Sequence, residues 1–333
     1  MKTLQGNKQA ILDALQQGSF VSGEALGEQL GISRAAVAKH IQSLQQLGLD
    51  IFTVTGKGYQ LSAKLSLLDP LKIERCYQAG QTDKKDSAQF EVFSIIDSTN
   101  SELMRRIVDN QKLSSGTVVV AQCQSSGRGR RGRQWQSPFG ANLYYSYYWF
   151  LDDGLQAAMG VSVAVGLAVY DCLKHLYGID VTLKWPNDVL VSEQKLAGVL
   201  VELDGPAEGP CNLVIGIGLN LAMPQSASEK IDQAWTDLNA LGVEVDKNVL
   251  VAALTQALER RLEQYRQTGL PTMQNEWNRV HAFQGQSVEL ITGQRRWQGI
   301  CEGIDPQGGI RIRQDGEVKS YFGGEISLRK VKV

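Results

Sequence analysis

The sequence has no long hydrophobic run, no excess of charge and few cysteines. Its longest apolar stretch, residues 159–170, is shorter than the roughly 20 residues that cross a bilayer, and residues 1–20 lack the apolar core of a signal peptide. The formal net charge of −1 over 333 residues excludes a general attraction to DNA or membranes. The five cysteines are odd in number and widely spaced, with no disulfide or metal spacing. We therefore predict a cytoplasmic protein with no membrane partner.

Several motifs of nucleotide binding and covalent catalysis are also absent. No G-x-G-x-x-G opens a helix, no Walker A lysine is present, and no G-x-S-x-G nucleophile turn occurs. The three histidines are scattered along the chain. A covalent enzyme intermediate is therefore not predicted. A site that binds and polarises anions fits better, as in phosphoryl or nucleotidyl chemistry.

The most informative feature present is a run of alternating glycine and arginine at residues 127–133, Gly-Arg-Gly-Arg-Arg-Gly-Arg. Glycine lets the backbone approach an anion, and arginine adds a charge on a planar fork that matches phosphate or carboxylate. A basic run is more often a tail or a nucleic-acid arm. Here β-branched and aromatic stretches at 117–121 and 142–149 flank the run, and we expect both to be strands. The run is therefore a loop and a candidate anion site.

Residues 1–64 show short helices followed by a hairpin. Ser22 and Ser33 are each placed to cap a helix, and Gly31 makes the turn between them, which predicts a helix-turn-helix. A Thr-Gly-Lys-Gly turn at 55–58 joins two alternating stretches and predicts a hairpin wing. The residues expected to face inward are Leu4, Ile11, Leu12 and Leu15 in the first helix, Ala25 and Leu26 in the second, and Val37, Ile41 and Leu44 in the third.

The polar face of the third helix predicts contact with DNA. Its side chains are of the types that reach phosphates and base edges from a major groove, and a lysine occupies the tip of the wing. A small helical domain that binds protein is the alternative, because any capped helical pair resembles this motif. The wing favours DNA. The candidate DNA-binding residues are Ser33, Arg34, Lys39, His40, Gln42 and Lys57.

The rest of the chain predicts two further domains, at 65–282 and 283–333. In the first, helical patterns alternate with strand-like runs that are mostly joined by hairpins, so we predict an α+β fold. Segment 78–89 is polar and linker-like, and no role is assigned to it. Short strands punctuated by glycines predict a small antiparallel β-barrel at the C-terminus. The central helices are expected at 98–110, 155–177 and 248–268, and the strands at 90–95, 117–122, 142–150, 181–184, 188–191, 197–203 and 212–218.

Three further motifs in the central segment carry polar groups. Residues 184–188, Lys-Trp-Pro-Asn-Asp, set a proline turn between a lysine and a carboxylate. Residues 195–198, Lys-Leu-Ala-Gly, place a lysine ahead of an apolar strand, where its ammonium would be partly desolvated. Residues 97–100, Asp-Ser-Thr-Asn, offer hydroxyls and an amide at a helix start. The plainer interpretations are surface lysines, a buried turn and an ordinary helix cap.

Taken in order, the Gly-Arg run and the two lysine motifs resemble the signature of biotin protein ligases. With the N-terminal winged helix, essentially the whole chain resembles the bifunctional kind that is also the biotin operon repressor. This resemblance implies a winged helix-turn-helix, a mixed-sheet catalytic domain of the biotin/lipoate ligase type and an SH3-like barrel. It implies that ATP and biotin, with Mg²⁺, give biotinyl-5′-AMP, whose biotinyl group passes to a lysine of the biotin carboxyl carrier domain of acetyl-CoA carboxylase.

The resemblance also implies regulation. Biotinyl-5′-AMP would act as corepressor, promote a homodimer and let the two winged helices bind operator DNA. Two alternatives stay open at this point. A lipoate ligase shares the catalytic architecture, but the winged helix and the Gly-Arg loop favour biotin. A ligand-sensing repressor without ligase activity is the other alternative, against which the retained Arg128, Lys184 and Lys195 argue.

By motif position, the resemblance assigns roles to individual residues. Arg128, Lys195, Lys184 and Asp188 are implied in catalysis. Arg128 would neutralise phosphate, and Asp188 would either assist deprotonation of the acceptor lysine or hold its turn. Metal ligands are not assigned. The biotin pocket would contain Ser98, Thr99, Asn100, Gln124, Gly127, Arg128, Gly129, Arg130 and Lys195, and the nucleotide site Arg130, Arg133, Lys184, Asn187, Asn220 and Trp235.

Overall fold

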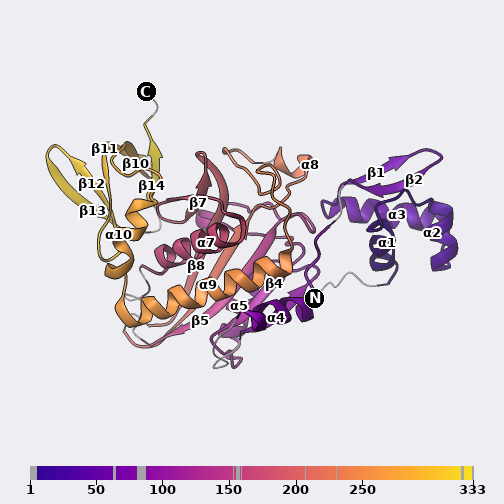
Figure 1. The fold of residues 1–333 in the computed structure, drawn as a ribbon, viewed down its shortest axis with the longest axis horizontal. Coiled ribbons are helices and arrows are strands. Elements are labelled where there is room, and N and C mark those ends of the chain that lie inside the picture. Colours follow the sequence, from indigo (N-terminus) through magenta and orange to yellow (C-terminus); the bar gives the residue numbers. More distant parts are fainter. Residues whose placement is uncertain are drawn as a thin grey trace.

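The computed structural model describes residues 6–62, 65–80, 88–152, 154, 158, 160–206, 208–229, 231–323 and 326–331. A small helical unit lies at one end of the molecule, a sheet covered by helices lies in the middle, and a small all-β unit lies at the other end (Figure 1). Residues 81–87 of the linker-like segment 78–89 lie outside the described residues. None of the described helices is both long and apolar enough to cross a membrane.

The N-terminal unit is the predicted winged helix. The side-chain oxygens of Ser22 and Ser33 accept the N–H groups of Ala25 and Ala36, and Gly31 adopts a φ of 65° between the two helices. These caps satisfy backbone groups that each helix leaves unpaired. The elements are α1 (Asn7–Leu15), α2 (Gly23–Leu30), α3 (Arg34–Gln46) and the antiparallel pair β1 (Ile51–Val54) and β2 (Gly58–Leu61).

The inward face of this unit is as predicted, with one correction. Ala25 is exposed. The buried positions of α2 are Gly23, Leu26 and Gly27, at the spacing of one helical face, and Ala25 falls outside that stripe. Leu4 lies outside the described residues. The other expected positions, Ile11, Leu12, Leu15, Leu26, Val37, Ile41 and Leu44, are buried.

A seven-stranded sheet forms the central unit. Among the described strands only β3 and β4 pair in parallel, and the other neighbours are antiparallel, so the α+β fold with a mixed sheet is confirmed. Residues alternate between the faces of β4, with Val118 and Val120 in one core and Val119 and Ala121 in another. The strand order is β3 (Gln89–Phe93), β4 (Thr117–Ala121), β5 (Leu143–Leu151), β9 (Cys211–Leu219), β8 (Gln194–Asp204), β7 (Asp188–Val191) and β6 (Thr182–Lys184).

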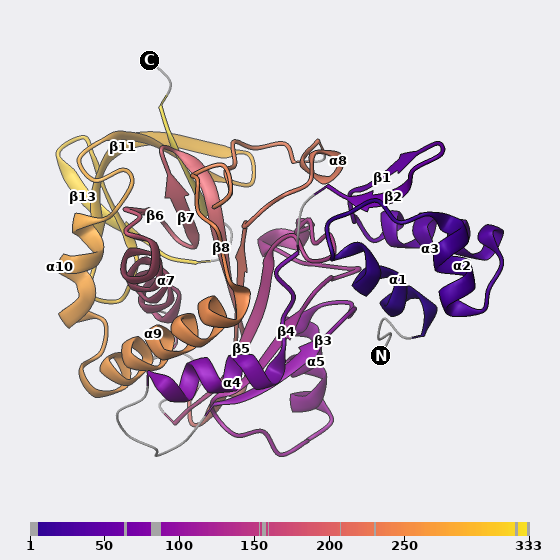
Figure 2. The same ribbon diagram turned by 45° about the vertical axis from the view of Figure 1, so that its right-hand side comes forward.

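Helices cover both faces of this sheet. α5 (Thr99–Val108) packs on one face, and α4 (Pro70–Ala79), α7 (Val161–Tyr177) and α9 (Lys247–Thr268) pack on the other (Figure 2). The predicted helices match α5, α7 and α9, with α7 beginning at Val161; residues 155–157 and 159 lie outside the described part of the chain. The sequence patterns do not predict α4 or α10 (Pro271–Arg279). Two short elements complete the unit, η1 (Arg130–Gly132) and α8 (Gln225–Ser228).

The C-terminal unit is a five-stranded antiparallel sheet. Its order places the two outer strands, β13 and β14, at opposite ends, so the predicted strands are confirmed while their closure into a barrel stays a prediction. The last strand, β14, is not predicted from the sequence. The strand order is β13 (Glu317–Tyr321), β12 (Ile310–Gln314), β11 (Arg295–Ile304), β10 (Ser287–Thr292) and β14 (Ile326–Lys330).

The winged helix rests on the central unit through a short segment that follows the Gly-Arg run. The Phe139 N–H donates to the Leu47 carbonyl at 2.8 Å. Gly48 lies against Pro138, and a Cβ atom on Gly48 would come within 2.4 Å of the Pro138 Cβ. Phe139 is buried in the same hydrophobic cluster as the winged-helix core. The C-terminal end of α3 is therefore packed directly against the central unit.

We predict that Gly48→Ala destabilises this joint more than Gly56→Ala destabilises the wing. Both glycines have a positive φ, 89° and 80°, so both alanines carry similar backbone strain. Only Gly48 would also clash with Pro138, whereas a Cβ on Gly56 meets nothing within 4 Å. We expect Gly48→Ala to lose about 1–3 kcal/mol more in free energy of unfolding, the usual range for overpacking. Urea unfolding of both variants measures this, and equal losses would contradict it.

Candidate active site

The predicted motifs meet at a cavity of about 820 Å³. It is bounded by β8 and β9, by the loop that carries the Gly-Arg run, and by β14 of the C-terminal unit. Gly127 does not line the cavity: it packs behind the loop, where a Cβ atom would come within 2.5 Å of the Ser137 Oγ. All other residues predicted for catalysis, biotin or nucleotide line it: Ser98, Thr99, Asn100, Gln124, Arg128, Gly129, Arg130, Arg133, Lys184, Asn187, Asp188, Lys195, Asn220 and Trp235.

One end of the cavity presents hydroxyl and amide groups. Ser98 is the N-cap of α5, and its Oγ accepts the Ser101 N–H. The N–H of Thr99 donates to the Gln124 Oε1 at 2.9 Å, and the Gln124 Nε2 donates to the Ser137 Oγ at 3.1 Å. The helix start is thus fixed by hydrogen bonds to the strand-end residue Gln124. Hydroxyl and amide groups converge here and can donate to a carbonyl or accept from N–H groups.

Asn100 lies beside this group in a buried network that the sequence does not reveal. The Ser146 Oγ, from β5, donates to the Asn100 Oδ1 at 2.5 Å, and the Asn100 Nδ2 donates to Glu202 of β8 at 2.8 Å. Gly216 of β9 makes room for Asn100, because a Cβ there would come within 2.3 Å of the Asn100 Oδ1. The role that the structure gives Asn100 is to join α5 to the sheet at the cavity wall.

The Gly-Arg run forms a closed loop. The Gly129 N–H donates to the Arg133 carbonyl at 2.7 Å, and the Trp135 N–H donates to the Gly127 carbonyl at 2.9 Å. Arg131 and Gly132 both have positive φ values, 57° and 67°, which turn the chain back at the tip. Such a left-handed turn suits glycine and is uncommon for arginine.

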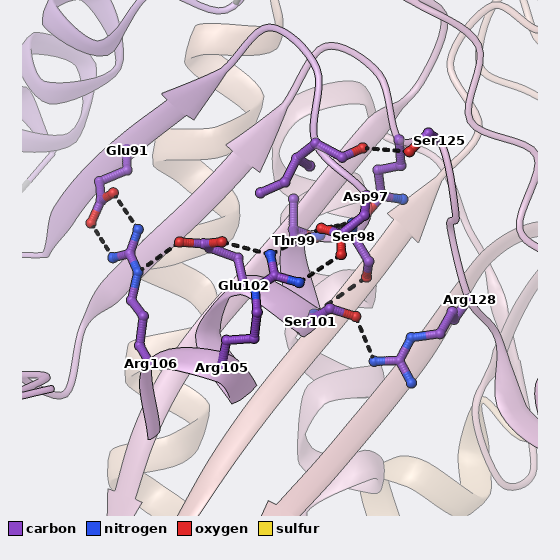
Figure 3. A network of polar contacts seen from close by, with 12 residues as sticks. Glu91, Asp97, Ser98, Thr99, Ser101, Glu102, Arg105, Arg106, Ser125 and Arg128 are labelled. Carbon is purple, nitrogen blue, oxygen red and sulfur yellow. Dashed lines mark hydrogen bonds and ion pairs between the residues drawn. The ribbon is translucent and has the colours of Figure 1, made fainter. Parts of the chain in front are cut away.

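Arg128 and Arg130 point to different parts of the site, although their sequence settings are similar. The Arg128 guanidinium is 43% exposed and forms an ion pair with Glu202 at 3.1 Å. It also donates to the Ser101 Oγ at 3.0 Å, at the first turn of α5 (Figure 3). Arg130 is half-buried and donates to the Asn187 Oδ1 at 2.9 Å, beside the lysine motif. The two arginines thus extend to different ends of the cavity, Arg128 to the start of α5 and Arg130 to the lysine motif, and the phosphate role predicted for Arg128 stays a prediction.

The other end of the cavity is a cluster of two lysines around one carboxylate. The Lys195 Nζ lies 2.7 Å from the Asp188 Oδ1, and the Lys184 Nζ lies 3.8 Å from the Oδ2. Burial lowers the pKa of Lys184; Asp188 raises it, and Lys195 lowers it again. The cluster is therefore held together by Asp188 but keeps an excess of positive charge. Asp188 is already paired with Lys195, which favours its positioning role over that of a free base.

Asn220 and Trp235 lie along the backbone that carries Lys195. The Lys195 N–H donates to the Ala234 carbonyl at 3.0 Å, and the backbone of Lys195 pairs with that of Trp235. The Asn220 Nδ2 donates to the carbonyls of Lys195 and Thr236. Both donor hydrogens of this amide are thus used to fix the segment, and only its oxygen is left to face the cavity.

Trp135 is a cavity residue that motif reasoning missed. Its indole lies over Gly198 and Gly218, and a Cβ on Gly218 would come within 2.5 Å of the ring. The Lys195 Nζ lies 5.3 Å from the centre of the ring, within the range of a cation–π contact. Among the described residues, the buried Trp135 Nε1 has no hydrogen-bond partner. Glycines on two neighbouring strands were the sequence signal for a flat group packed there.

The C-terminal unit also contributes to the cavity, which the sequence does not predict. Residues 326–330, in β14, line it. Two contacts join the C-terminal unit to the central unit: the Trp185 Nε1 donates at 2.9 Å to the carbonyl of Gly308, which lies between β11 and β12, and the Lys330 Nζ of β14 lies 2.6 Å from the Glu193 Oε1. The Lys-Trp-Pro-Asn-Asp turn is therefore fastened to the C-terminal sheet, and its Trp185–Pro186 peptide is cis.

The predicted DNA-binding residues lie on the surface of the winged helix. Arg34, Lys39 and Gln42 are exposed on α3, and Lys57 is exposed at the tip of the wing. His40 is half-buried. The hydroxyl of Ser33 caps α3, so its first role is structural. α3 and the wing tip thus present basic side chains outside the core of the unit.

Three family models match successive parts of the chain. An HTH domain matches residues 7–60, the Biotin/lipoate A/B protein ligase family matches 92–220, and the Biotin protein ligase C terminal domain matches 283–329. Similarity also extends over the whole chain. The Bifunctional ligase/repressor BirA of Salmonella typhimurium is 44% identical over 322 residues, which cover 97% of each chain. The same-named protein of Escherichia coli is 43% identical with the same coverage.

The chain belongs to the biotin protein ligase family. Within the family it groups with the bifunctional ligase/repressors, because it carries both the DNA-binding and the ligase units. A solved structure, the biotin protein ligase from Aquifex aeolicus in complex with biotin and ATP, is 27% identical with a TM-score of 0.62. It covers 73% of this chain and 99% of its own. The biotin protein ligase fold predicted from the motifs is therefore confirmed.

Proposed function

We propose that the cavity joins biotin to ATP and passes the biotinyl group to a lysine of the biotin carboxyl carrier domain of acetyl-CoA carboxylase. One observation carries this proposal: the cavity has one end of hydroxyl and amide groups and one cationic end, joined by the Gly-Arg loop. Biotin has the matching shape, with a neutral ureido ring at one end and a carboxylate at the other. ATP supplies the second anion that the cationic end must hold.

The reaction takes two steps. A carboxylate oxygen of biotin attacks the α-phosphorus of ATP, and pyrophosphate leaves. The amine of the acceptor lysine then attacks the carbonyl carbon of biotinyl-5′-AMP, AMP leaves, and a base takes the amine proton. The first step brings two anions to bonding distance, which at about 4 Å and an effective dielectric near 20 opposes the reaction by roughly 4 kcal/mol per charge pair. The lysines and Arg130 are the groups that offset this repulsion.

We assign the polar end to the biotin ring. Ser98, Thr99 and Gln124 present hydroxyl and amide groups, as recognition of a ureido carbonyl and its two N–H groups requires. The dithiolane ring of lipoate has no such polar groups, so this end favours biotin over lipoate. Asn100 shapes the wall through Ser146. The backbone of 128–130 would close the ring site, with Gly127 packed behind it.

We assign the cationic end to the carboxylate–phosphate junction. Lys195 would contact that junction, and Lys184 and Arg133 would contact the phosphates. Arg130 and Asn187, already hydrogen-bonded to each other, would lie beside the phosphates. Trp235 would lie near adenine, with Asn220 fixing its segment. Asp188 would hold both lysines in place; its role as a base stays a prediction.

Mg²⁺, when bound, would neutralise charge on the triphosphate. The described residues contain no group of three His, Cys, Asp or Glu side chains that could hold a metal ion. Mg²⁺ commonly binds through substrate phosphates together with one or two protein carboxylates, so it does not need a dedicated group of protein ligands. The ion would therefore enter with ATP.

The N-terminal unit makes the protein a repressor as well as a ligase. We propose that biotinyl-5′-AMP acts as corepressor by favouring a homodimer, whose two winged helices would bind a two-fold operator. Residues 1–64, 65–282 and 283–333 would act as DNA-binding, catalytic and cavity-closing units. A cytoplasmic location stays a prediction.

The ligase proposal is tested by incubating the chain with ATP, biotin and a biotin carboxyl carrier domain, and measuring the mass of the carrier. We expect the mass of one biotinyl group on the carrier, and none when its acceptor lysine is replaced by arginine. Binding of biotin without any labelling of the carrier would instead support a repressor that lacks ligase activity. Equal labelling with lipoate would contradict the assignment of the polar end.

The different settings of the two arginines give a second prediction. Arg130→Met should raise the KM for ATP about tenfold, because it removes a charge-assisted hydrogen bond at the cationic end. Arg128→Met should instead raise the KM for biotin, because Arg128 contacts the first turn of α5. The same substitution in one loop makes the two variants matched controls. Steady-state kinetics with ATP and biotin varied in turn measure the two KM values for each variant. The same change in both KM values in both variants would contradict the prediction.

DNA binding gives a third prediction. Arg34→Ala and Lys57→Ala should each weaken binding to a mixed-sequence DNA duplex. Each should also reduce the slope of log affinity against log salt by about 0.9, the value for one lost phosphate contact. Lys72→Ala, an exposed lysine on α4, is the charge-matched control and should change neither. Unchanged salt slopes in the first two variants would place the DNA contact elsewhere.

A further inference from the structure

Glu202 lies directly behind the cavity wall and touches two of its residues. It stands near the end of β8, and its side chain is 23% exposed. One carboxylate oxygen lies 3.1 Å from the Arg128 Nη1; the other accepts from the Arg128 Nη2 at 3.1 Å and from the Asn100 Nδ2 at 2.8 Å. Glu202 itself does not line the cavity. It therefore cannot act on the substrates except through Arg128 and Asn100.

These contacts join three separate parts of the site. Arg128 belongs to the loop that closes the cavity, Asn100 belongs to the first turn of α5, and Glu202 belongs to the sheet. Arg128 is fastened on both sides, because it also donates to Ser101 of α5 (Figure 3). The Arg128 guanidinium meets the carboxylate through one hydrogen bond, from Nη2, and a further ion-pair contact at Nη1, and such a charge-assisted pair fixes orientation as well as distance. The start of the Gly-Arg loop is thus held against the sheet by an ion pair.

We propose that Glu202 is a positioning residue that holds the Gly-Arg loop closed over the biotin ring site through Arg128. This rests on the proposed function, since it names the ring site as the part that the loop covers. Without the carboxylate, the Arg128 side chain loses its fixed partner on the sheet, and the loop start is held to the body by fewer contacts. Biotin and biotinyl-5′-AMP then dissociate faster, while the lysine cluster that carries out the chemistry is unchanged.

Glu202→Gln is the variant that tests this. Glutamine has nearly the same shape. The carboxylate oxygen that accepts from Asn100 also accepts from the Arg128 Nη2, so an amide oxygen in its place keeps both partners but loses the charge, and the amide NH₂ group faces the Arg128 Nη1 in place of an acceptor. We expect the Kd for biotin, measured by calorimetry, to rise about tenfold, because an ion pair is replaced by a neutral hydrogen bond beside two opposed N–H groups. Biotinyl-5′-AMP should dissociate faster by a similar factor. The rate of transfer at saturating substrate should change less than about twofold.

Glu91→Gln is the matched control. Glu91 of β3 forms a bidentate ion pair with Arg106 of α5. This pair lies at the other end of the polar network from Arg128 (Figure 3). Neither residue lines the cavity. A general loosening of α5 would affect this control as much as Glu202→Gln. Thermal unfolding of both variants checks that each is folded.

A double-variant cycle separates positioning through Arg128 from other effects. In an Arg128→Met background, Glu202→Gln should change the Kd for biotin by less than about twofold, because its partner is already gone. An unchanged Kd in the single variant, or a full tenfold change in the Arg128→Met background, would overturn the proposal. If the wild-type chain binds no biotin, the proposed function itself fails, and the calorimetry of the wild type shows this separately.

Discussion

The ion pairs of Asp188 with Lys195 and Lys184 are the interaction on which the site depends. Two ammonium groups at about 4 Å repel each other by roughly 4 kcal/mol at an effective dielectric near 20, and burial adds to that penalty. A carboxylate between them removes most of this repulsion. The sheet sets the arrangement, because Lys184 pairs with Asp188 across β6 and β7, and Asp188 pairs with Gly198 across β7 and β8. A compact cationic centre is thereby built into rigid strands.

The rest of the cavity is arranged around this centre. Gly198 and Gly218 leave a flat surface on which the Trp135 ring lies beside Lys195. The side-chain amide of Asn220 donates to the backbone carbonyl of Lys195 and so fixes the segment that carries this lysine. The hydroxyl and amide groups of the first turn of α5 lie at the other end. The cavity therefore differs in chemical character along its length. Under the proposed function, this difference orients a ligand that has a neutral head and an anionic tail, with its tail toward the lysines.

Motif positions could be predicted from the sequence because they are local, whereas side-chain directions could not. The start of α4 carries a signal that pattern reasoning passed over, since Asp69 caps the helix and Pro70 follows at its first position. In contrast, nothing in the Gly-Arg run distinguishes Arg128 from Arg130. The positive φ at Arg131 reverses the chain. The direction of each side chain is then set by a distant partner, Glu202 of β8 for Arg128 and Asn187 of the 184–188 turn for Arg130. Residues of β14 line the cavity because the C-terminal unit packs against the central unit, and a local sequence pattern does not predict such packing.

The segment that follows the Gly-Arg loop joins the cavity to the winged helix. It runs from Ser137, hydrogen-bonded to Gln124 at the cavity wall, to Phe139, whose N–H donates to Leu47 of the winged helix. Only Pro138 lies between Ser137 and Phe139, so one short segment contacts both the cavity wall and the end of α3. Gly140 is held in turn by the buried Lys247, whose ammonium donates to its carbonyl. Burial lowers the pKa of Lys247 to about 7. The Gly140 N–H donates to the Gln122 carbonyl at 2.7 Å, so this residue is held through both of its backbone polar groups, and the segment between the cavity and the winged helix is fixed at its far end as well.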